Sequence, residues 1–302
     1  MYDVMIVGGG PAGMTAALYA ARAGMKLLLL EGELIGGQAS TTNRIENFPG
    51  FPGGTGGPEL MMQFDAQLGQ MDVYPQYEQV RELSLLGDVK KAVTKAGSYE
   101  ARTVILAMGA ARRRLGIPGE EQLNGRGISY CATCDGALYA GKRVAVVGGG
   151  HSAVEDTLYL AQRSDVLLIH RRDQLRAVSE DAQVALSHPR VQTAWNEQVI
   201  SVDKNADGLL LTLQNSLDGA KHTELVSALF VAVGTDPKSD LIKDQVALTK
   251  DGYVQANEDT ITSVPGVFVA GDLRAKPLKQ VVTAVADGAV AATMTARYII
   301  GG

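Results

Sequence analysis

The sequence has few of the features that mark secreted, membrane-embedded or nucleic-acid-binding proteins. Only two cysteines, Cys131 and Cys134, occur in 302 residues, which excludes a framework of disulfide bonds. No apolar run approaches the roughly 18 residues that a membrane-spanning helix needs, and no basic region precedes an apolar stretch as in a signal peptide. The net charge is −5, from 28 Lys and Arg against 33 Asp and Glu, so no basic footprint for nucleic acid exists. We expect a soluble, cytoplasmic protein that binds neither membranes nor nucleic acid.

The composition is that of a folded protein with many glycines. Apolar residues make up 46% of the chain and charged residues 20%, which is typical of globular domains. A length of 302 residues fits two domains of about 150 residues, or one large domain. Glycine occurs 35 times, and its placement between strands and helices carries most of the functional information.

Short runs rich in Val, Ile and Leu, bounded by turn residues, predict strands buried on both faces of a sheet. Helical patterns follow several of these runs, and that alternation predicts an α/β fold with parallel sheets. The predicted strands are 4–7, 26–30, 103–107, 143–147, 166–170, 225–233 and 267–270, and the predicted helices are 12–23, 152–163 and 283–298. Glycine-rich segment 51–57 is interpreted as a surface loop, with the edge of a cofactor site as the alternative.

One unit of strand, glycine turn, helix and strand occurs twice, at 3–31 and at 143–171. The spacing between the two units, from residue 3 to residue 143, is too long for the repeats of a solenoid. The repeated unit therefore predicts two Rossmann-like dinucleotide-binding domains. Segments similar to the first domain resume after residue 245, which makes the second domain an insertion. The predicted domains are therefore 1–112 with 245–302, and 113–244.

The first glycine turn, 8–13, has the pattern G-x-G-x-x-G between a strand and a helix. Gly8 permits a tight turn, Gly10 allows close approach of a pyrophosphate, and Gly13 lets helix and strand pack together. Glu31 ends the next strand, where a carboxylate can accept hydrogen bonds from ribose hydroxyls. The pattern predicts a dinucleotide whose ribose carries no 2′-phosphate.

The second glycine turn, 148–153, has the pattern G-x-G-x-x-A, in which Ala153 replaces the packing glycine. No acidic residue ends the following strand. A basic segment follows instead, containing His170, Arg171, Arg172 and Arg176. Guanidinium groups suit a 2′-phosphate, which favours NADP(H); the alternative is a solvated basic turn.

The two cysteines form a C-x-x-C pair followed by Asp135, and three interpretations compete. Zinc would need further ligands, but no second C-x-x-C exists and the four histidines are scattered, so no metal site is expected. Inert buried thiols are the second interpretation. A reducible disulfide is the third and is favoured, because this spacing can close a small redox loop. Asp135 could shuttle protons or cap a helix.

Five motifs in order resemble those of the low-molecular-weight thioredoxin reductases over essentially the whole chain. They are the first glycine turn, CATCDG at 131–136, the second glycine turn, HRRDQLR at 170–176 and GVFVAGD at 266–272. The resemblance implies FAD in the first domain and NADPH in the inserted one. It implies FAD contacts at Gly10, Ala12, Gly13, Glu31, Gly37, Gln38, Asn47, Gly109, Gly271, Asp272, Gln280 and Val281. It implies NADPH contacts at Gly150, Ser152, Ala153, His170, Arg171, Arg172 and Arg176.

The resemblance further implies a homodimeric, NADPH-dependent thioredoxin-disulfide reductase. Hydride would pass from NADPH to FAD, and electrons then to the Cys131–Cys134 disulfide and to thioredoxin or a thioredoxin-like protein. Cys134 would meet the flavin, Cys131 would attack the partner's disulfide, and Asp135 would donate and accept protons. The alternatives are a flavin dithiol oxidase, a reductase of another disulfide partner, a ferredoxin-dependent enzyme and a non-catalytic nucleotide-sensing flavoprotein.

Four features depart from the family pattern. Met108 replaces a common Thr, Lys279 a common Arg, and His151 a common Asn. Ala137 and Leu138 follow CATCDG where many relatives carry aromatic residues that dock thioredoxin.

Overall fold

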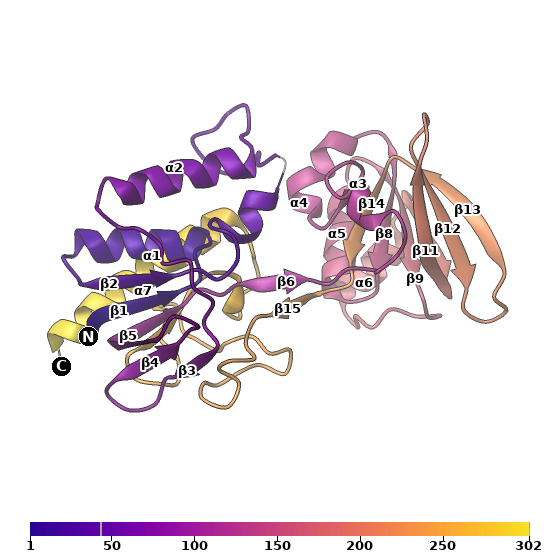
Figure 1. The fold of residues 1–302 in the computed structure, drawn as a ribbon. Helices are drawn as coiled ribbons and strands as arrows, with labels where there is room; N and C mark the ends of the chain where they lie inside the picture. The colour runs from indigo at the N-terminus through magenta and orange to yellow at the C-terminus, as the bar shows by residue number, and fades with distance from the viewer. Residues whose placement is uncertain (43, 302) are drawn as a thin grey trace. The chain divides into compact units, whose positions relative to one another are not determined.

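The computed structural model describes residues 1–42 and 44–301, so that Asn43 and Gly302 lie outside the described residues. The chain forms two compact units, coloured by residue number in Figure 1. Unit 1 contains Met1–Ala111 and Asp236–Gly302, and unit 2 contains Arg112–Thr235. The sequence places the second joint at 244/245, whereas residues 236–244 belong to unit 1. Ile242 explains the difference, because it is fully buried in the core of unit 1.

Unit 1 is built on a sheet with the strand order β2–β1–β5–β4–β3, with β16 also paired to β5. β1 (Tyr2–Val7), β2 (Leu27–Leu30), β5 (Ser98–Leu106) and β16 (Val267–Val269) are parallel. β3 (Glu82–Ser84) and β4 (Lys90–Val93) are antiparallel. The parallel strands therefore place their carboxyl ends, and the turns that follow, at one edge of the sheet.

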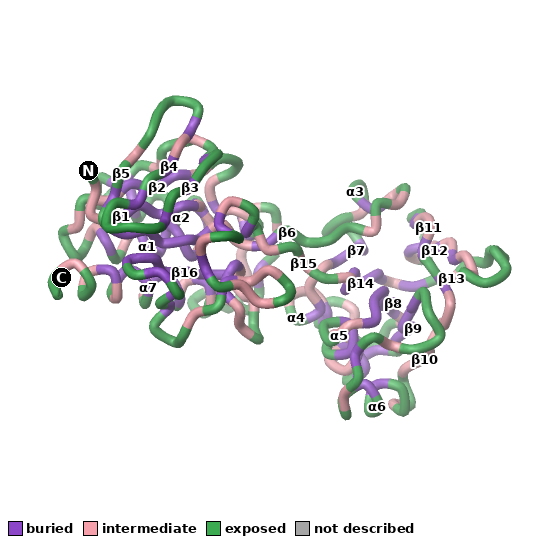
Figure 2. The backbone as a smooth tube through the Cα atoms, turned by 90° about the horizontal axis from the view of Figure 1, so that it is seen from below, coloured by how far each residue is buried: buried purple, intermediate pink, exposed green. Residues whose placement is uncertain are grey.

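Side chains of the unit 1 sheet are buried on both faces. Val4 and Ile6 of β1 pack in one core with residues of α1 (Pro11–Arg22), α2 (Gly57–Gly69) and α7 (Val281–Gly301). Met5 and Val7 point to the opposite core. This alternation follows from the two-residue period of a strand. The last four residues of β1 are buried, and Figure 2 shows buried, purple stretches in the interior of unit 1.

Unit 2 contains a five-stranded parallel sheet with the order β10–β9–β8–β14–β7 and a three-stranded antiparallel sheet, β11–β12–β13. The parallel strands are β7 (Ile128–Ser129), β8 (Arg143–Gly148), β9 (Asp165–His170), β10 (Val191–Trp195) and β14 (Ala228–Ala232). The antiparallel strands are β11 (Glu197–Lys204), β12 (Leu209–Asn215) and β13 (Lys221–Val226). Leu211 and Leu213 of β12 share a core with Ala145 and Ile169 of the parallel sheet.

The helices of unit 2 are short, and two of them contact strands of the parallel sheet, namely the helices at 151–161 and 180–187. They are α3 (Glu120–Leu123), α4 (Ala132–Asp135), α5 (His151–Ala161) and α6 (Glu180–Ser187), with a 3-10 turn η2 (Gly136–Tyr139) after α4. The remaining strands, β6 (Ala110–Arg112) and β15 (Thr235–Pro237), form a two-stranded sheet.

The predicted α/β fold with parallel sheets is confirmed, and the main corrections concern strands. The predicted strand 225–233 is two strands, because the backbone N–H of Ser227 bonds to Arg143 O and the chain changes sheet there. The antiparallel strands and α2 and α6 were not predicted. The predicted loop 51–57 ends at Gly56, since Gly57 opens α2. No helix of the described residues combines the length and the hydropathy needed to cross a bilayer.

Candidate functional site

The first glycine turn connects β1 to α1 in a way that requires glycine. A Cβ on Gly13 would lie 1.8 Å from the carbonyl oxygen of Gly8, so the helix could not pack against the turn. Gly8 has a φ of 108°, and a Cβ there would lie 2.4 Å from Ala107 O. A Cβ on Gly10 would instead meet nothing within 4 Å. Gly13 is thus needed for packing, whereas Gly10 borders open space at the helix N-terminus.

The helices after both glycine turns begin without a side-chain cap. Gly10 caps α1 and Gly150 caps α5, neither N-cap makes a side-chain hydrogen bond, and neither first turn contains an acidic residue. By contrast, Ser179 caps α6 by accepting from Ala182 N, and two acidic residues occupy its first turn. Unpaired N–H groups and the positive end of the helix dipole attract phosphate. Both turns therefore fit a dinucleotide pyrophosphate.

Glu31 lies beside the first turn, as the sequence predicts. Its Oε2 accepts from Gly9 N at 2.6 Å, and its Oε1 accepts from Glu33 N at 2.7 Å. These two hydrogen bonds fix the carboxylate at the carboxyl end of β2. Carboxylate oxygens accept more than one hydrogen bond each, so the group can still receive ribose hydroxyls.

Two distant segments converge on the start of α1. A Cβ on Gly37 would lie 3.3 Å from the Cα of Gly10, and one on Gly271 would lie 2.9 Å from the Cβ of Ala12. Gly37 and Gly271 both have positive φ, 54° and 76°. The structure thus brings four of the predicted FAD residues to one place in unit 1.

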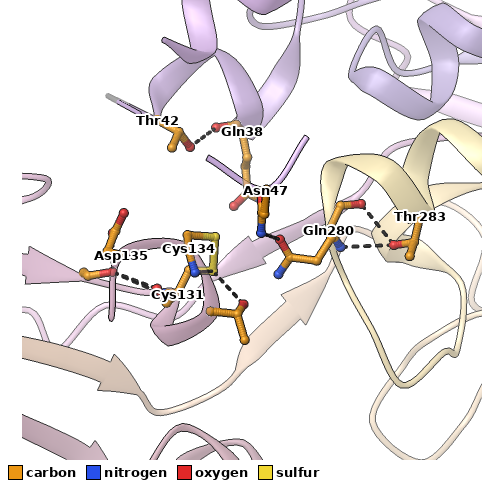
Figure 3. The surroundings of a disulfide bond; sticks show 10 residues. Gln38, Thr42, Asn47, Cys131, Cys134, Asp135, Gln280 and Thr283 are labelled. Carbon is orange, nitrogen blue, oxygen red and sulfur yellow. Dashed lines mark hydrogen bonds between the residues drawn. A yellow bond between two sulfur atoms is a disulfide. The ribbon is translucent and has the colours of Figure 1, made fainter. Parts of the chain in front are cut away.

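The other predicted FAD residues also lie in unit 1. Asn47 Nδ2 donates to Gln280 Oε1 at 3.0 Å, which joins the 44–50 segment to the start of α7 (Figure 3). Gln38 Nε2 donates to Ala110 O. The remaining three are Gly109 with a φ of 70°, Asp272 in the 3-10 turn η3 (Gly271–Leu273), and Val281 as the first residue of α7.

A buried charge cluster near η3 was not predicted from the sequence. Asp287 on α7 accepts from Gly271 N at 3.0 Å, from Arg274 Nη1 at 2.8 Å and from Lys276 Nζ at 2.9 Å. All three charged side chains are at least nine-tenths buried. Asp287 therefore fixes the Gly271 backbone, but no sequence motif identifies this carboxylate.

The basic segment after β9 lies against the second glycine turn. Arg176 N and Ala177 N both donate to Gly149 O, at 2.7 and 3.1 Å. A Cβ on Gly150 would lie 2.9 Å from Nη2 of Arg176, so this guanidinium lies at the turn. Arg171 and Arg172 are exposed on the same segment. The segment supplies the cationic groups that a phosphate needs beside the N-terminus of α5.

His170 is the one buried member of this basic segment. A Cβ on Gly149 would lie 2.1 Å from Cε1 of its ring, so the imidazole packs on the turn. Burial lowers the pKa of His170, and the charges of Arg171 and Arg172 lower it further. Its buried Nε2 has no hydrogen-bond partner among the described residues, which fits a side chain that contacts a polar ligand. On α5, Ser152 is exposed and Ala153 is buried against Gly148.

Cys131 and Cys134 form a disulfide, with their Cα atoms 5.3 Å apart (Figure 3). This agrees with the redox interpretation of the pair. Cys131 Sγ accepts from Cys134 N at 3.2 Å and lies 3.4 Å from the Thr133 hydroxyl oxygen. Because a disulfide sulfur carries no hydrogen, the Thr133 hydroxyl donates. Two donors therefore converge on the sulfur of Cys131.

Asp135 is the last residue of α4, and its carboxylate contacts Ser129, which was not among the predicted site residues. Ser129, at the end of β7, donates from Oγ to Asp135 Oδ2 at 2.6 Å. Ser129 also accepts from Cys131 N at 3.1 Å. The structure thus brings the three predicted catalytic residues together in unit 2. Neither residue spacing nor a motif could have found Ser129, because its role depends on how β7 and α4 meet.

Three positions that depart from the family pattern have defined surroundings. Met108 packs against a core of unit 1, and Lys279 Nζ lies 4.1 Å from the ring centre of Tyr253. After the disulfide, Leu138 is 49% exposed.

Within residues 1–42 and 44–301, no group of three or more His, Cys, Asp or Glu is placed to hold a metal ion.

Comparison with known proteins gives concordant results. The profile of the pyridine nucleotide-disulphide oxidoreductase family matches residues 2–288. The chain is 39% identical to a thioredoxin reductase of Peptoclostridium acidaminophilum, covering 99% of this chain and 97% of that protein. It is 42% identical to a bifunctional thioredoxin reductase/thioredoxin of Mycobacterium leprae, covering 99% of this chain and 66% of that protein. The crystal structure of a thioredoxin reductase from Streptococcus pyogenes matches with a TM-score of 0.94 at 40% identity, covering 100% of this chain and 99% of that one.

Proposed function

The chain belongs to the pyridine nucleotide-disulphide oxidoreductase family, and we propose that it acts there as an NADPH-dependent thioredoxin reductase with bound FAD. The observation that carries this proposal is the disulfide of Cys131 and Cys134 with Asp135 beside it. Full-length similarity to proteins named thioredoxin reductase supports the same activity. Bound FAD supplies a carrier that takes two electrons from NADPH and passes them to a disulfide.

We assign FAD to unit 1. The uncapped N-terminus of α1 binds the pyrophosphate, and the open space at Gly10 lets the phosphates approach the backbone. Glu31 binds the ribose. The residues proposed to hold FAD are Gly10, Ala12, Gly13, Glu31, Gly37, Gln38, Asn47, Gly109, Gly271, Asp272, Gln280 and Val281.

We assign NADPH to unit 2. The N-terminus of α5 binds the pyrophosphate, and the basic segment binds the 2′-phosphate through guanidinium groups. The residues proposed to hold NADPH are Gly150, Ser152, Ala153, His170, Arg171, Arg172 and Arg176. A neutral His170 adds a polar contact without adding charge, because burial and its arginine neighbours lower its pKa.

The thiol chemistry follows from the two sulfur atoms. The Cys131 thiolate attacks the partner's disulfide, which breaks that S–S bond and forms a mixed disulfide with Cys131. Cys134 then loses its proton and attacks Cys131 Sγ, so that the Cys131–Cys134 disulfide re-forms. The partner leaves as a dithiol with two more electrons and two more protons, one from the Cys134 thiol by way of Asp135 and one from solvent water, which protonates the partner sulfur released in the first attack. Asp135 accepts the Cys134 proton and returns one to the departing sulfur.

The donors around Cys131 support its role as the attacking thiolate. The N–H of Cys134 and the hydroxyl of Thr133 both point at its sulfur, and hydrogen bonds to a charged form stabilise that form. The assignment of Cys134 to the flavin side rests on the family resemblance.

We also propose a homodimer in the cytoplasm with thioredoxin, or a thioredoxin-like protein, as the partner. The cytoplasm is a reducing compartment, where disulfides are mostly transient and catalytic, and this suits a cysteine pair that alternates between dithiol and disulfide. The M. leprae relative bears both activities in its name, which supports thioredoxin as the partner class. Exposed Leu138 beside the disulfide offers an apolar contact to it.

A coupled assay tests the proposed function. The FAD-loaded protein, NADPH and a panel of thioredoxins are mixed without oxygen, and NADPH absorbance is followed. We expect NADPH loss that depends on an added thioredoxin and stops when its disulfide is consumed. NADPH loss that needs oxygen and ignores every thioredoxin would favour the flavin dithiol oxidase instead.

A further inference from the structure

Ser129 places a buried hydroxyl between the Asp135 carboxylate and the backbone of Cys131. We infer that Ser129 is a positioning residue that holds Asp135 in place for proton transfer at the Cys131–Cys134 pair. The inference rests on the proposed function for its chemistry, although the geometry on which it depends is independent of any cofactor.

The donor and the acceptor of each hydrogen bond at Ser129 can be assigned. Its Oγ lies 2.6 Å from Asp135 Oδ2 and 3.3 Å from Cys131 O, and a hydroxyl has a single hydrogen. The much shorter contact is to the carboxylate, so that hydrogen goes to Asp135. The N–H of Cys131 then donates to the lone pair of Oγ at 3.1 Å. The result is a chain from the Cys131 amide through the Ser129 hydroxyl to the carboxylate.

The burial of Ser129 holds this series of hydrogen bonds in place. Ser129 is only 4% exposed, whereas Asp135 and both cysteines are partly exposed. Ser129 lies at the end of β7, the edge strand of the parallel sheet, which pairs with β14. The hydroxyl thus links the carboxylate of a four-residue helix to the sheet of unit 2. Without that link, Asp135 can turn towards solvent, and the distance to the reacting sulfur is no longer fixed.

Ser129 itself loses no proton in the reaction. Asp135 accepts the Cys134 proton and passes a proton to the departing sulfur of the partner, while the Ser129 hydroxyl remains a donor to the carboxylate. A hydrogen bond to an ionised carboxylate is charge-assisted and favours the ionised form. Without that hydrogen bond the protonated carboxyl is favoured, and a protonated carboxyl cannot accept the Cys134 proton.

Other titratable groups lie on the elements packed against α4. On η2, burial and then the charge of Asp135 raise the pKa of Tyr139. On α5, burial and then Glu155 raise the pKa of Asp156 to about 7, and Tyr159 lies on the same helix. The change Ser129→Ala leaves all of them in place, so a difference between variant and wild type reports on the hydroxyl.

The test compares Ser129→Ala with Ser164→Ala. Ser164 is the matched control because its hydroxyl is also buried and donates to a backbone oxygen, that of Tyr139, at 2.9 Å. In the thioredoxin assay we expect kcat of Ser129→Ala to fall about tenfold or more, since general acid–base groups contribute about 10²–10⁴-fold. The acidic limb of its pH–rate profile should move to higher pH. NADPH-dependent reduction of ferricyanide, which bypasses the thiols, should stay within about twofold of wild type.

A second measurement keeps this inference separate from the proposed function. The reduced proteins are alkylated with iodoacetamide across a pH series, which needs neither NADPH nor a partner. We expect the pH dependence of thiol alkylation to shift in Ser129→Ala and to be unchanged in Ser164→Ala. Unchanged alkylation and pH–rate profiles in Ser129→Ala, or equal losses in both variants, would overturn the inference. A wild type inactive with every thioredoxin would contradict the proposed function alone, and the alkylation profiles would still decide the role of Ser129.

Discussion

At the scale of single residues, the arginines of the basic segment are the groups that can distinguish NADPH from NADH. Arg176 lies at the second glycine turn, and Arg171 and Arg172 are exposed on the same segment. The two nucleotides differ by one phosphate, so a guanidinium that binds this phosphate affects only one of them. A purely structural arginine would affect both equally.

We expect the double change Arg171→Ala, Arg172→Ala to weaken NADPH selectively. Each charge-assisted hydrogen bond contributes about 1.5–3 kcal/mol, and tenfold in affinity corresponds to about 1.4 kcal/mol. The Kd for NADPH should therefore rise at least about a hundredfold on these figures, while that for NADH changes little. Titration calorimetry measures both constants. The control is Arg163→Ala, Arg190→Ala, because these exposed residues lie beyond the C-terminus of α5 and before β10, away from the turn. Equal weakening of both nucleotides would show that the segment is structural.

The two cysteines should differ in how they capture a partner. In Cys134→Ser the attacking thiol of Cys131 remains and cannot be released from the mixed disulfide, so a covalent complex with oxidised thioredoxin should accumulate. In Cys131→Ser it should not. Non-reducing electrophoresis and mass spectrometry read out the complex. Capture by Cys131→Ser alone would reverse the two roles.

At the scale of elements, substitutions of Gly13 and Gly10 in the first glycine turn should have different effects, one on stability and the other on FAD binding. Gly13→Ala puts a Cβ against Gly8 O, so the β1–α1 packing and the thermal stability of the protein should suffer. Gly10→Ala puts a Cβ into open space, with φ at −75°, so the fold should keep its stability within about 0.5 kcal/mol. Its FAD affinity should nevertheless fall about tenfold or more, roughly 1.4 kcal/mol. FAD fluorescence and thermal unfolding separate the two effects. A Gly10→Ala protein that binds FAD normally would contradict the assignment of the pyrophosphate to this turn.

Helix α3 contains a buried carboxylate that should make the stability of unit 2 depend on pH. Burial alone would raise the pKa of Glu120, but hydrogen bonds from Tyr130 and from the backbone of 115–117 outweigh it and lower the pKa below 4.5. A lowered folded-state pKa stabilises the protein above the unfolded-state value and loses that effect as pH falls through the folded-state value.

We expect Glu120→Gln to lower the free energy of unfolding by about 1–3 kcal/mol at neutral pH, because an amide donor replaces one acceptor. The difference from wild type should shrink in acid, as pH falls below 4.5. Urea denaturation at several pH values measures it. The control is Glu121→Gln on the same helix, whose side chain is 84% exposed beside Arg114 and should contribute less than about 1 kcal/mol. A pH-independent difference would show that the Glu120 charge is not what stabilises the segment.

The strands and turns that the sequence predicted best are those with a strong local pattern. The buried runs of β1 and β8 and the glycine turns after them follow from apolar continuity and from steric limits at Gly8 and Gly13. The prediction of one strand at 225–233 was wrong because a single apolar run covers two strands, β13 and β14, which pair in different sheets. Ser129 and Asp287 act through partners on other elements, so no local pattern identifies them.

At the scale of the whole molecule, each unit contains one glycine turn, and the disulfide lies in the same unit as the basic segment. The residues proposed to hold NADPH lie with the disulfide in unit 2, and those proposed to hold FAD lie in unit 1, where the flavin would supply the two-electron carrier between nucleotide and disulfide.

The most direct test of this account counts the thiols that NADPH produces. The FAD-loaded protein is incubated with NADPH without oxygen or a partner, quenched with an alkylating agent and analysed by mass spectrometry. We predict two alkyl groups per chain, on Cys131 and Cys134, after incubation with NADPH and none without it. A protein that oxidises NADPH while its Cys131–Cys134 disulfide stays unlabelled would contradict the account.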